Sequence, residues 1–145
     1  MNIIELKSRQ NISTDIKLSK IYSQFEELLS ELKKKELPLN IIAAINKSVE
    51  QINFSTLTGT QLRKLVKQNQ TTILKQIEKE LKIVPKNHYL NLGTALGICL
   101  LGIIIGMFIG KLLYGLPIGM LIGIFIGSAL DKKAFSEGRQ LNLKI

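Results

Sequence analysis

The feature that most constrains this chain is an apolar stretch from Tyr89 to Leu130. It contains one formally charged residue, Lys111, near its middle. The hydrocarbon core of a bilayer takes about 20 residues of helix to cross. The stretch is therefore long enough for two membrane-spanning helices with the charged residue at the turn between them. We expect the spans at about 89–109 and 112–130. Because the second span is short, we expect either a tight turn around residues 110–113 or local thinning of the bilayer.

Glycines recur through this stretch at intervals of four or five residues. They are Gly93, Gly97, Gly102, Gly106, Gly110, Gly115, Gly119, Gly123 and Gly127. Small residues repeated every four positions let two helix backbones approach closely in lipid. The five-residue step from Gly97 to Gly102 would rotate the later glycines to roughly the opposite side of a regular α-helix. We therefore predict two glycine-zipper faces on the first helix, one packed within the hairpin and the other against a neighbouring chain in a homo-oligomer.

Basic and aromatic residues at the ends of the two spans are candidate anchors at the membrane interface. They are Lys86, His88, Tyr89, Lys111, Tyr114, Lys132 and Lys133. Lysines also accumulate before the hairpin and after it, whereas the turn between the spans has only Lys111. The excess of basic residues on cytoplasmic loops then predicts that both termini are cytoplasmic. The first residues contain no apolar signal segment, so we expect the hairpin itself to direct insertion.

The region before the hairpin is polar and Lys-rich, with 15 Lys or Arg and 9 Asp or Glu residues up to residue 88. Three stripes of apolar residues at spacings of three and four predict three amphipathic helices. The first begins after the cap-forming residues Ser13, Thr14 and Asp15, and Pro38 separates it from the second. The third is expected at about 61–84, with a stripe weakened by polar residues at 68–72. Residues 1–12 have no pattern and are expected to be frayed or loosely docked.

These stripes predict an all-α protein with three parts. Residues 1–84 form a cytoplasmic domain of about three helices, residues 85–130 form the transmembrane hairpin, and residues 131–145 form a basic cytoplasmic tail that Asp131, Lys132 and Lys133 begin. The alternative for the first part is a set of short coiled-coil segments that pair between chains.

Few residues in the sequence are suited to catalysis. His88 is the only histidine and Cys99 the only cysteine, and Cys99 lies in the middle of the first span. No phosphate-binding loop, dinucleotide-binding turn or metal-ligand spacing is present in the sequence. We therefore expect no enzyme activity, catalytic residue, cofactor or metal. The basic residues Arg63, Lys64 and Lys67 have no interleaved aromatic residues, so we expect no nucleic-acid partner and favour a solvated face or contact with anionic lipid.

The C-terminal part of the chain resembles a known family on specific residues. It is similar to small glycine-zipper membrane proteins of Bacteroidota-type bacteria. The resemblance is carried by the glycine series from Gly115 to Gly127, by the residues that follow it, and by the preceding segment 86–89 (KNHY). The residues that follow and carry the resemblance are Asp131, Lys132, Lys133, Ala134, Glu137, Gly138 and Arg139. The resemblance implies a two-span protein of a bacterial inner membrane and no particular activity.

Two functions are compatible with this sequence. The first is a self-associating hairpin that anchors a cytoplasmic helical adaptor module, with the lipid bilayer and a cytoplasmic protein of unknown identity as partners. The alternative is a membrane-perturbing oligomer of the holin, bacteriocin or antiphage-effector kind. A third class, a small selective channel, is disfavoured because the spans have almost no polar residues to line a hydrated path. The same lack of polar residues weakens the membrane-perturbing alternative and favours the anchor.

Overall fold

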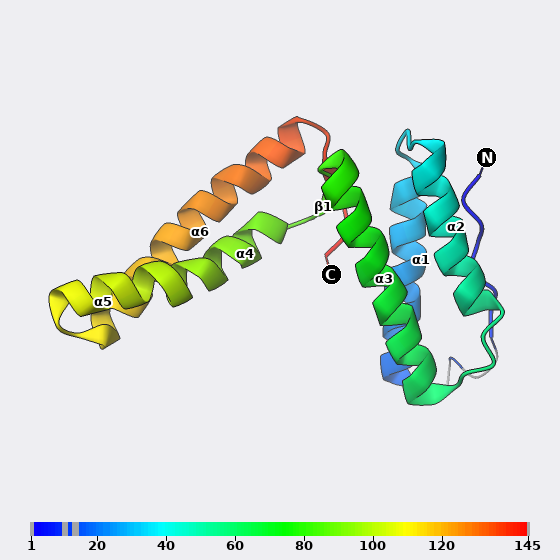
Figure 1. Cartoon of the computed structure of the whole chain (residues 1–145), viewed down its shortest axis with the longest axis horizontal. Helices are drawn as coiled ribbons and strands as arrows, with labels where there is room; N and C mark the ends of the chain where they lie inside the picture. Colours follow the sequence, from blue (N-terminus) through cyan, green and yellow to red (C-terminus); the bar gives the residue numbers. More distant parts are fainter. Residues whose placement is uncertain (1, 10–11, 13–14, 145) are drawn as a thin grey trace. The chain divides into compact units, whose positions relative to one another are not determined.

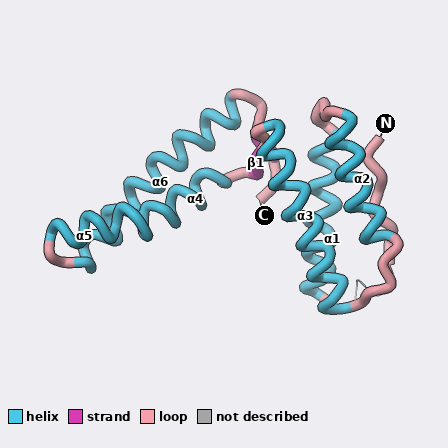
Figure 2. The backbone as a smooth tube through the Cα atoms, viewed as in Figure 1, coloured by secondary structure: helices cyan, strands magenta, loops and turns pink. Residues whose placement is uncertain are grey.

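The computed structural model describes residues 2–9, 12 and 15–144, and the chain divides into two compact units between Lys82 and Ile83. The predicted all-α class is confirmed. The strands among the described residues are limited to one pair of two residues each, β1 (Val84–Pro85) and β2 (Gln140–Leu141). Figure 1 shows the helices in chain order, and Figure 2 shows the loops that connect them.

The first helix, α1 (Ile16–Lys33), begins where a side chain satisfies its free N–H groups. The Asp15 carboxylate accepts hydrogen bonds from the main-chain N–H groups of Lys17, at 2.9 Å, and Leu18, at 3.1 Å. An N-cap of this kind stabilises a helix by about 1 kcal/mol. Ser13 and Thr14, the other predicted cap residues, lie outside the described residues.

Two more helices complete the first unit. Pro38 precedes α2 (Leu39–Asn53), and α3 (Gly59–Leu81) packs against both α1 and α2. Asn69 and Gln70 are buried within the apolar stripe of α3. Two residues of the expected polar interruption are therefore part of the core, where Asn69 donates to the carbonyl of Leu65 at 3.0 Å. The other three, Gln68, Thr71 and Thr72, are exposed.

The third helix ends earlier than the sequence indicates. We expected it to reach Val84, but it stops at Leu81 because Lys82 adopts a left-handed conformation with φ of 57°. Val84 then pairs with Gln140 and Pro85 with Leu141 in the parallel β1–β2 pair. Residues that follow the hairpin thus hydrogen-bond to residues that precede it.

The segment before α1 is docked, which corrects the expectation of a frayed or loosely held start. Ile3 is buried, and residues from Asn2 to Arg9 hydrogen-bond to α1 and α2 of the same unit. The sequence lacks a periodic pattern here because the segment is extended and its main chain makes most of these bonds.

The second unit is a helical hairpin. Its first arm is continuous through α4 (His88–Leu96), the π-helical segment η2 (Gly97–Gly102) and α5 (Ile103–Ile109), and its second arm is α6 (Leu112–Ser136). The second arm lies beside the first along its length (Figure 1). The helix continues past Leu130, the expected end of the second span, to Ser136, and Gly138 then turns the chain with φ of 68°.

Candidate functional site: the glycine-packed hairpin

The two arms of the hairpin contact each other through glycines. A Cβ atom built on Gly102 would lie 2.9 Å from the Cα atom of Leu116, and one on Gly106 would lie 2.8 Å from the Cα atom of Leu112. Gly97 faces Gly119 and Gly123, and Gly93 faces Gly123 and Gly127 in the same way. Carbon atoms are not found closer than about 3.5 Å without repulsion. The glycines of the first arm therefore meet main-chain atoms of α6 directly, beside the side chains of Leu112 and Leu116, and only glycine fits at these positions.

Both glycine series of the first arm face the same helix, which makes the expectation of two opposite faces wrong. Five residues of α-helix rotate the chain by roughly 140° beyond a full turn. Gly97–Gly102, however, is a π-helical turn, in which each hydrogen bond spans five residues and one extra residue is accommodated. Gly102 and Gly106 consequently stay on the side of Gly93 and Gly97, and all four contact α6.

Gly110 lies in the expected tight turn and not in the helix-packing series, to which it was also assigned. It is not a helix-packing residue, since a Cβ atom there would meet no atom within 4 Å. Its φ of 71° is in the left-handed region that side chains other than glycine rarely adopt. Gly110 therefore ends α5 and forms the tight turn, and Lys111 follows as the residue that precedes α6.

The outer surface of the hairpin consists of large apolar side chains that are exposed in the protein. They include Leu92, Leu96, Leu100, Ile103, Ile104, Met107, Phe108, Leu113, Leu121, Phe125, Ile126 and Leu130. The arms, at 22 and 25 residues, are both long and apolar enough to span a bilayer. Soluble monomers rarely expose a continuous apolar surface of this extent. A medium other than water therefore suits this surface best.

The candidate anchors lie at the two ends of the hairpin. At the turn, the ammonium of Lys111 lies 5.8 Å from the ring centroid of Tyr114, a cation–π contact. At the open end, the rings of His88 and Tyr89 meet edge to face with centroids 5.1 Å apart. Lys133 pairs with Glu137 at 4.0 Å, whereas Lys86 and Lys132 both line one cavity. The structure thus gathers five of the seven predicted anchors at one end and two at the other.

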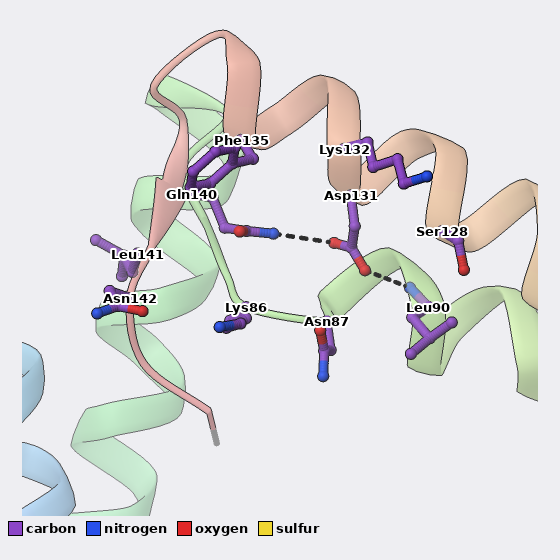
Figure 3. A pocket seen from close by; sticks show the side chains of 10 residues that line it. All are labelled: Lys86, Asn87, Leu90, Ser128, Asp131, Lys132, Phe135, Gln140, Leu141 and Asn142. Atoms are coloured by element: carbon purple, nitrogen blue, oxygen red, sulfur yellow. Dashed lines mark hydrogen bonds between the residues drawn. The ribbon is translucent and has the colours of Figure 1, made fainter.

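Asp131 closes the open end of the hairpin, a role that the sequence analysis missed. Its carboxylate accepts a hydrogen bond from the main-chain N–H group of Leu90 at 2.9 Å (Figure 3). It accepts a second from the main-chain N–H group of Tyr89 at 3.3 Å. Asn87, the residue before α4, is left-handed and its side chain makes no cap bond. Asp131 therefore caps α4 from the opposite arm, and Gln140 donates to it at 3.5 Å. Asn87 is itself a common N-cap residue, so no signal in the sequence pointed to a cap from Asp131.

The cavity beside Asp131 has a volume of about 410 Å³. Figure 3 shows that its lining comes from α6, from the start of α4 and from β2, and that it mixes apolar side chains such as Leu90 and Phe135 with Lys86 and Lys132. Within the described part of the chain, no group of three His, Cys, Asp or Glu residues is placed to hold a metal ion. Cys99 lies in η2 and is exposed on the apolar outer surface.

Comparisons with family models, with curated proteins and with solved structures found no match to this chain.

Proposed function

We propose that this chain is an integral membrane protein whose hairpin crosses the bilayer twice and anchors a helical interaction module formed by the first unit. The observation that carries the proposal is the division of the hairpin surface. Its inner face is closed by glycine contacts, and its outer face is apolar along both arms. Lipid is the medium that such an outer face requires, and a helix is suited to lipid because its main-chain hydrogen bonds are made within the helix.

The two flanks of the hairpin belong on the same side of this membrane. Asp131 at the end of α6 bonds to Leu90 near the start of α4, and β2 pairs with β1. Both flanks carry several lysines, and the far turn has only Lys111. The positive-inside rule then favours cytoplasmic termini, and the family resemblance supports a bacterial inner membrane.

The proposed role is structural rather than enzymatic. The first unit would present its helices to a cytoplasmic protein, and copies of the chain would associate in the membrane. The glycines do not offer a second face for that association, because they all contact the opposite arm or form the turn. A membrane-perturbing oligomer has less support, since the side chains exposed along both arms are apolar and would line a water-filled path poorly.

The experiment is a test of topology in intact cells. In a Cys99→Ala background, Lys111→Cys should react with a membrane-impermeant maleimide added outside, whereas Asn2→Cys and Ser136→Cys should react only after the cells are opened. The protein should also remain in the membrane fraction after alkaline carbonate washing. Labelling of Ser136→Cys from outside, or recovery of the protein in the soluble fraction, would contradict the two-span proposal.

A further inference from the structure

The cavity at the open end of the hairpin lies where the chain changes from apolar to charged. The apolar outer surface extends to Leu92 on α4 and to Leu130 on α6, both of which are exposed. A few residues beyond each of them in the chain, Lys86 and Lys132 line the cavity. In a bilayer that the hairpin crosses, this boundary lies at the level of the lipid headgroups, where the phosphate groups are found.

The two lysines come from different arms of the hairpin. Lys86 lies between β1 and α4, whereas Lys132 belongs to α6, so the packing of the arms brings them to one cavity (Figure 3). Both residues are exposed. Among the residues that the structure describes, neither ammonium has an ion-pair partner. Both ammonium groups are therefore available to an anion from outside the protein.

The lining of the cavity has a net positive charge. Its acidic member among the described residues is Asp131, against the two lysines. The Asp131 carboxylate already accepts hydrogen bonds from the main-chain N–H groups of Leu90 and Tyr89 and from the amide of Gln140. These donors stabilise its negative charge without the help of either lysine. The cavity therefore favours an anionic ligand over a cation.

The size and the apolar part of the lining suit a lipid headgroup better than a small ion. The cavity has a volume of about 410 Å³, and pockets that hold small molecules have volumes of about 300–1,000 Å³. A free phosphate would leave most of this space empty. Leu90 and Phe135 also line the cavity and would contact the glycerol and the first acyl carbons of a lipid. The rest of each acyl chain would follow the exposed apolar surface of the arms.

We propose that this cavity binds one anionic phospholipid, with Lys86 and Lys132 contacting its phosphate and with Leu90 and Phe135 contacting its apolar part. Basic pockets between transmembrane helices on the cytoplasmic side are suited to acidic headgroups. The inference rests on the proposed function, since an inserted hairpin is what places the cavity beside lipid. It deepens that function by naming the class of lipid that the anchor recognises.

The experiment measures how much radiolabelled phosphatidylglycerol the immobilised full-length protein retains in dodecyl maltoside micelles. The parent protein should retain the label in a saturable way. Joint replacement by Lys86→Gln and Lys132→Gln should raise the half-saturating lipid concentration about tenfold or more, since one basic residue beside an anionic lipid is worth about fivefold in binding. Unlabelled phosphatidylcholine, which has no net charge, should displace the label much less well than unlabelled phosphatidylglycerol does.

A matched control makes the same change of charge at the same end of the hairpin. Joint replacement by Lys133→Gln and Lys144→Gln removes two lysines that do not line the cavity, and this protein should retain the label as the parent does. All four lysines are exposed, so the replacements should leave the fold unchanged. Circular dichroism of the parent and of both variants checks that their helix content is equal.

Four results would overturn the proposal. Retention that does not saturate in the parent would mean that the cavity holds no lipid. An equal loss of label in the two variants would assign the retention to the general charge of the surface. Equal displacement by phosphatidylcholine would assign it to apolar contacts alone. Displacement by inorganic phosphate, at constant ionic strength, would show that the cavity takes a free phosphate.

Carbonate washing of membranes from cells that express the parent tests the proposed function separately. Recovery of the parent in the soluble fraction would contradict the membrane anchor. A parent protein that stays in the membrane fraction but retains no more label than the variant without Lys86 and Lys132 would contradict the lipid site alone.

Discussion

The carboxylate of Asp131 lies 2.9 Å from the main-chain nitrogen of Leu90, forty-one residues earlier in the chain, and accepts its hydrogen. The second arm of the hairpin therefore supplies the cap that starts the first arm. Asp131 is buried, so no water replaces this bond when it is lost. The same bond fixes the register of the two arms at their open end, next to the β1–β2 pair.

Asp131→Ala should consequently destabilise the hairpin by about 1–2 kcal/mol, the usual cost of removing an N-cap. Asp131→Asn keeps an oxygen that can accept the hydrogen bond from the Leu90 N–H group, so it should destabilise the hairpin less. Lys132→Ala, the neighbouring change, should have little effect because that side chain is exposed. Unfolding by sodium dodecyl sulphate titration in detergent micelles, followed by circular dichroism, measures the order of stability. Equal stability of Asp131→Ala and Lys132→Ala would show that the cap is not formed.

Gly97→Leu and Gly106→Leu should damage the protein in the same way, because both glycines contact α6. A leucine at either place would overlap main-chain atoms of the other arm, and we expect a loss of about 1–3 kcal/mol or more. Pulse proteolysis of the hairpin in micelles should detect it. Ala95→Leu, on the exposed side of α4, is the matched control and should be neutral. If one glycine variant changed the oligomer size while its hairpin stayed intact, the result would support the hypothesis of two opposite glycine faces.

Deletion of Cys99 should be tolerated. It removes one residue from the π-helical turn and leaves Gly97 and the next glycine four residues apart, as a regular α-helix requires to keep both on one face. Deletion of Ile122, which is also exposed, shortens the interval between Gly119 and Gly123 in α6, where no π-helical turn can absorb the change. In a thermal aggregation assay in detergent, the Cys99 deletion should therefore have a midpoint temperature close to that of the parent protein. The Ile122 deletion should have a lower midpoint temperature. An equal fall in the midpoint temperature for both deletions would argue against the π-helical turn.

Alkaline pH should release the N-terminal segment. The Tyr22 hydroxyl donates to the carbonyl of Lys7 at 2.6 Å, and burial raises the pKa of Tyr22 above its ordinary value of about 10, with Arg9 opposing the shift. The folded state therefore holds the proton more tightly than the unfolded state, and its stability is full below about pH 10 and falls as the pH rises through the folded pKa.

The measurement is the rate at which a maleimide labels Leu6→Cys, in a Cys99→Ala background, between pH 8 and 11, corrected for thiol ionisation with a free cysteine peptide. In the protein that retains Tyr22, the corrected labelling rate should rise above about pH 10. In Tyr22→Phe, which lacks the titrating group, the corrected rate should be higher at pH 8 and nearly independent of pH. The same pH-dependent rise in both proteins would remove Tyr22 as the cause.

The sequence predicted the elements that depend on neighbouring residues. Asp15 begins α1 because its carboxylate reaches the N–H groups two and three residues on, and Pro38 precedes α2 because its fixed φ suits that position. The turn at Gly110 and the start of α6 at Leu112 also agree with the expected tight turn. The charges at 131–133 predict an end to the membrane span, but the helix itself continues through them to Ser136, since Asp and Lys are both compatible with a helix.

Sequence alone determined that this chain has two helices long and apolar enough to cross a bilayer, with glycines at the spacing that allows close packing, because apolar length and helical period are properties of the local chain. Only the tertiary structure decided which way those glycines face. A regular α-helix would put Gly102 on the side opposite Gly97, but the π-helical turn at Gly97–Gly102 keeps both on one side. It likewise decided that Asp131 caps α4 and that Asn46 and Asn53 hold residues 2–9. These contacts join residues more than forty positions apart, and their formation depends on which surfaces meet when the helices pack.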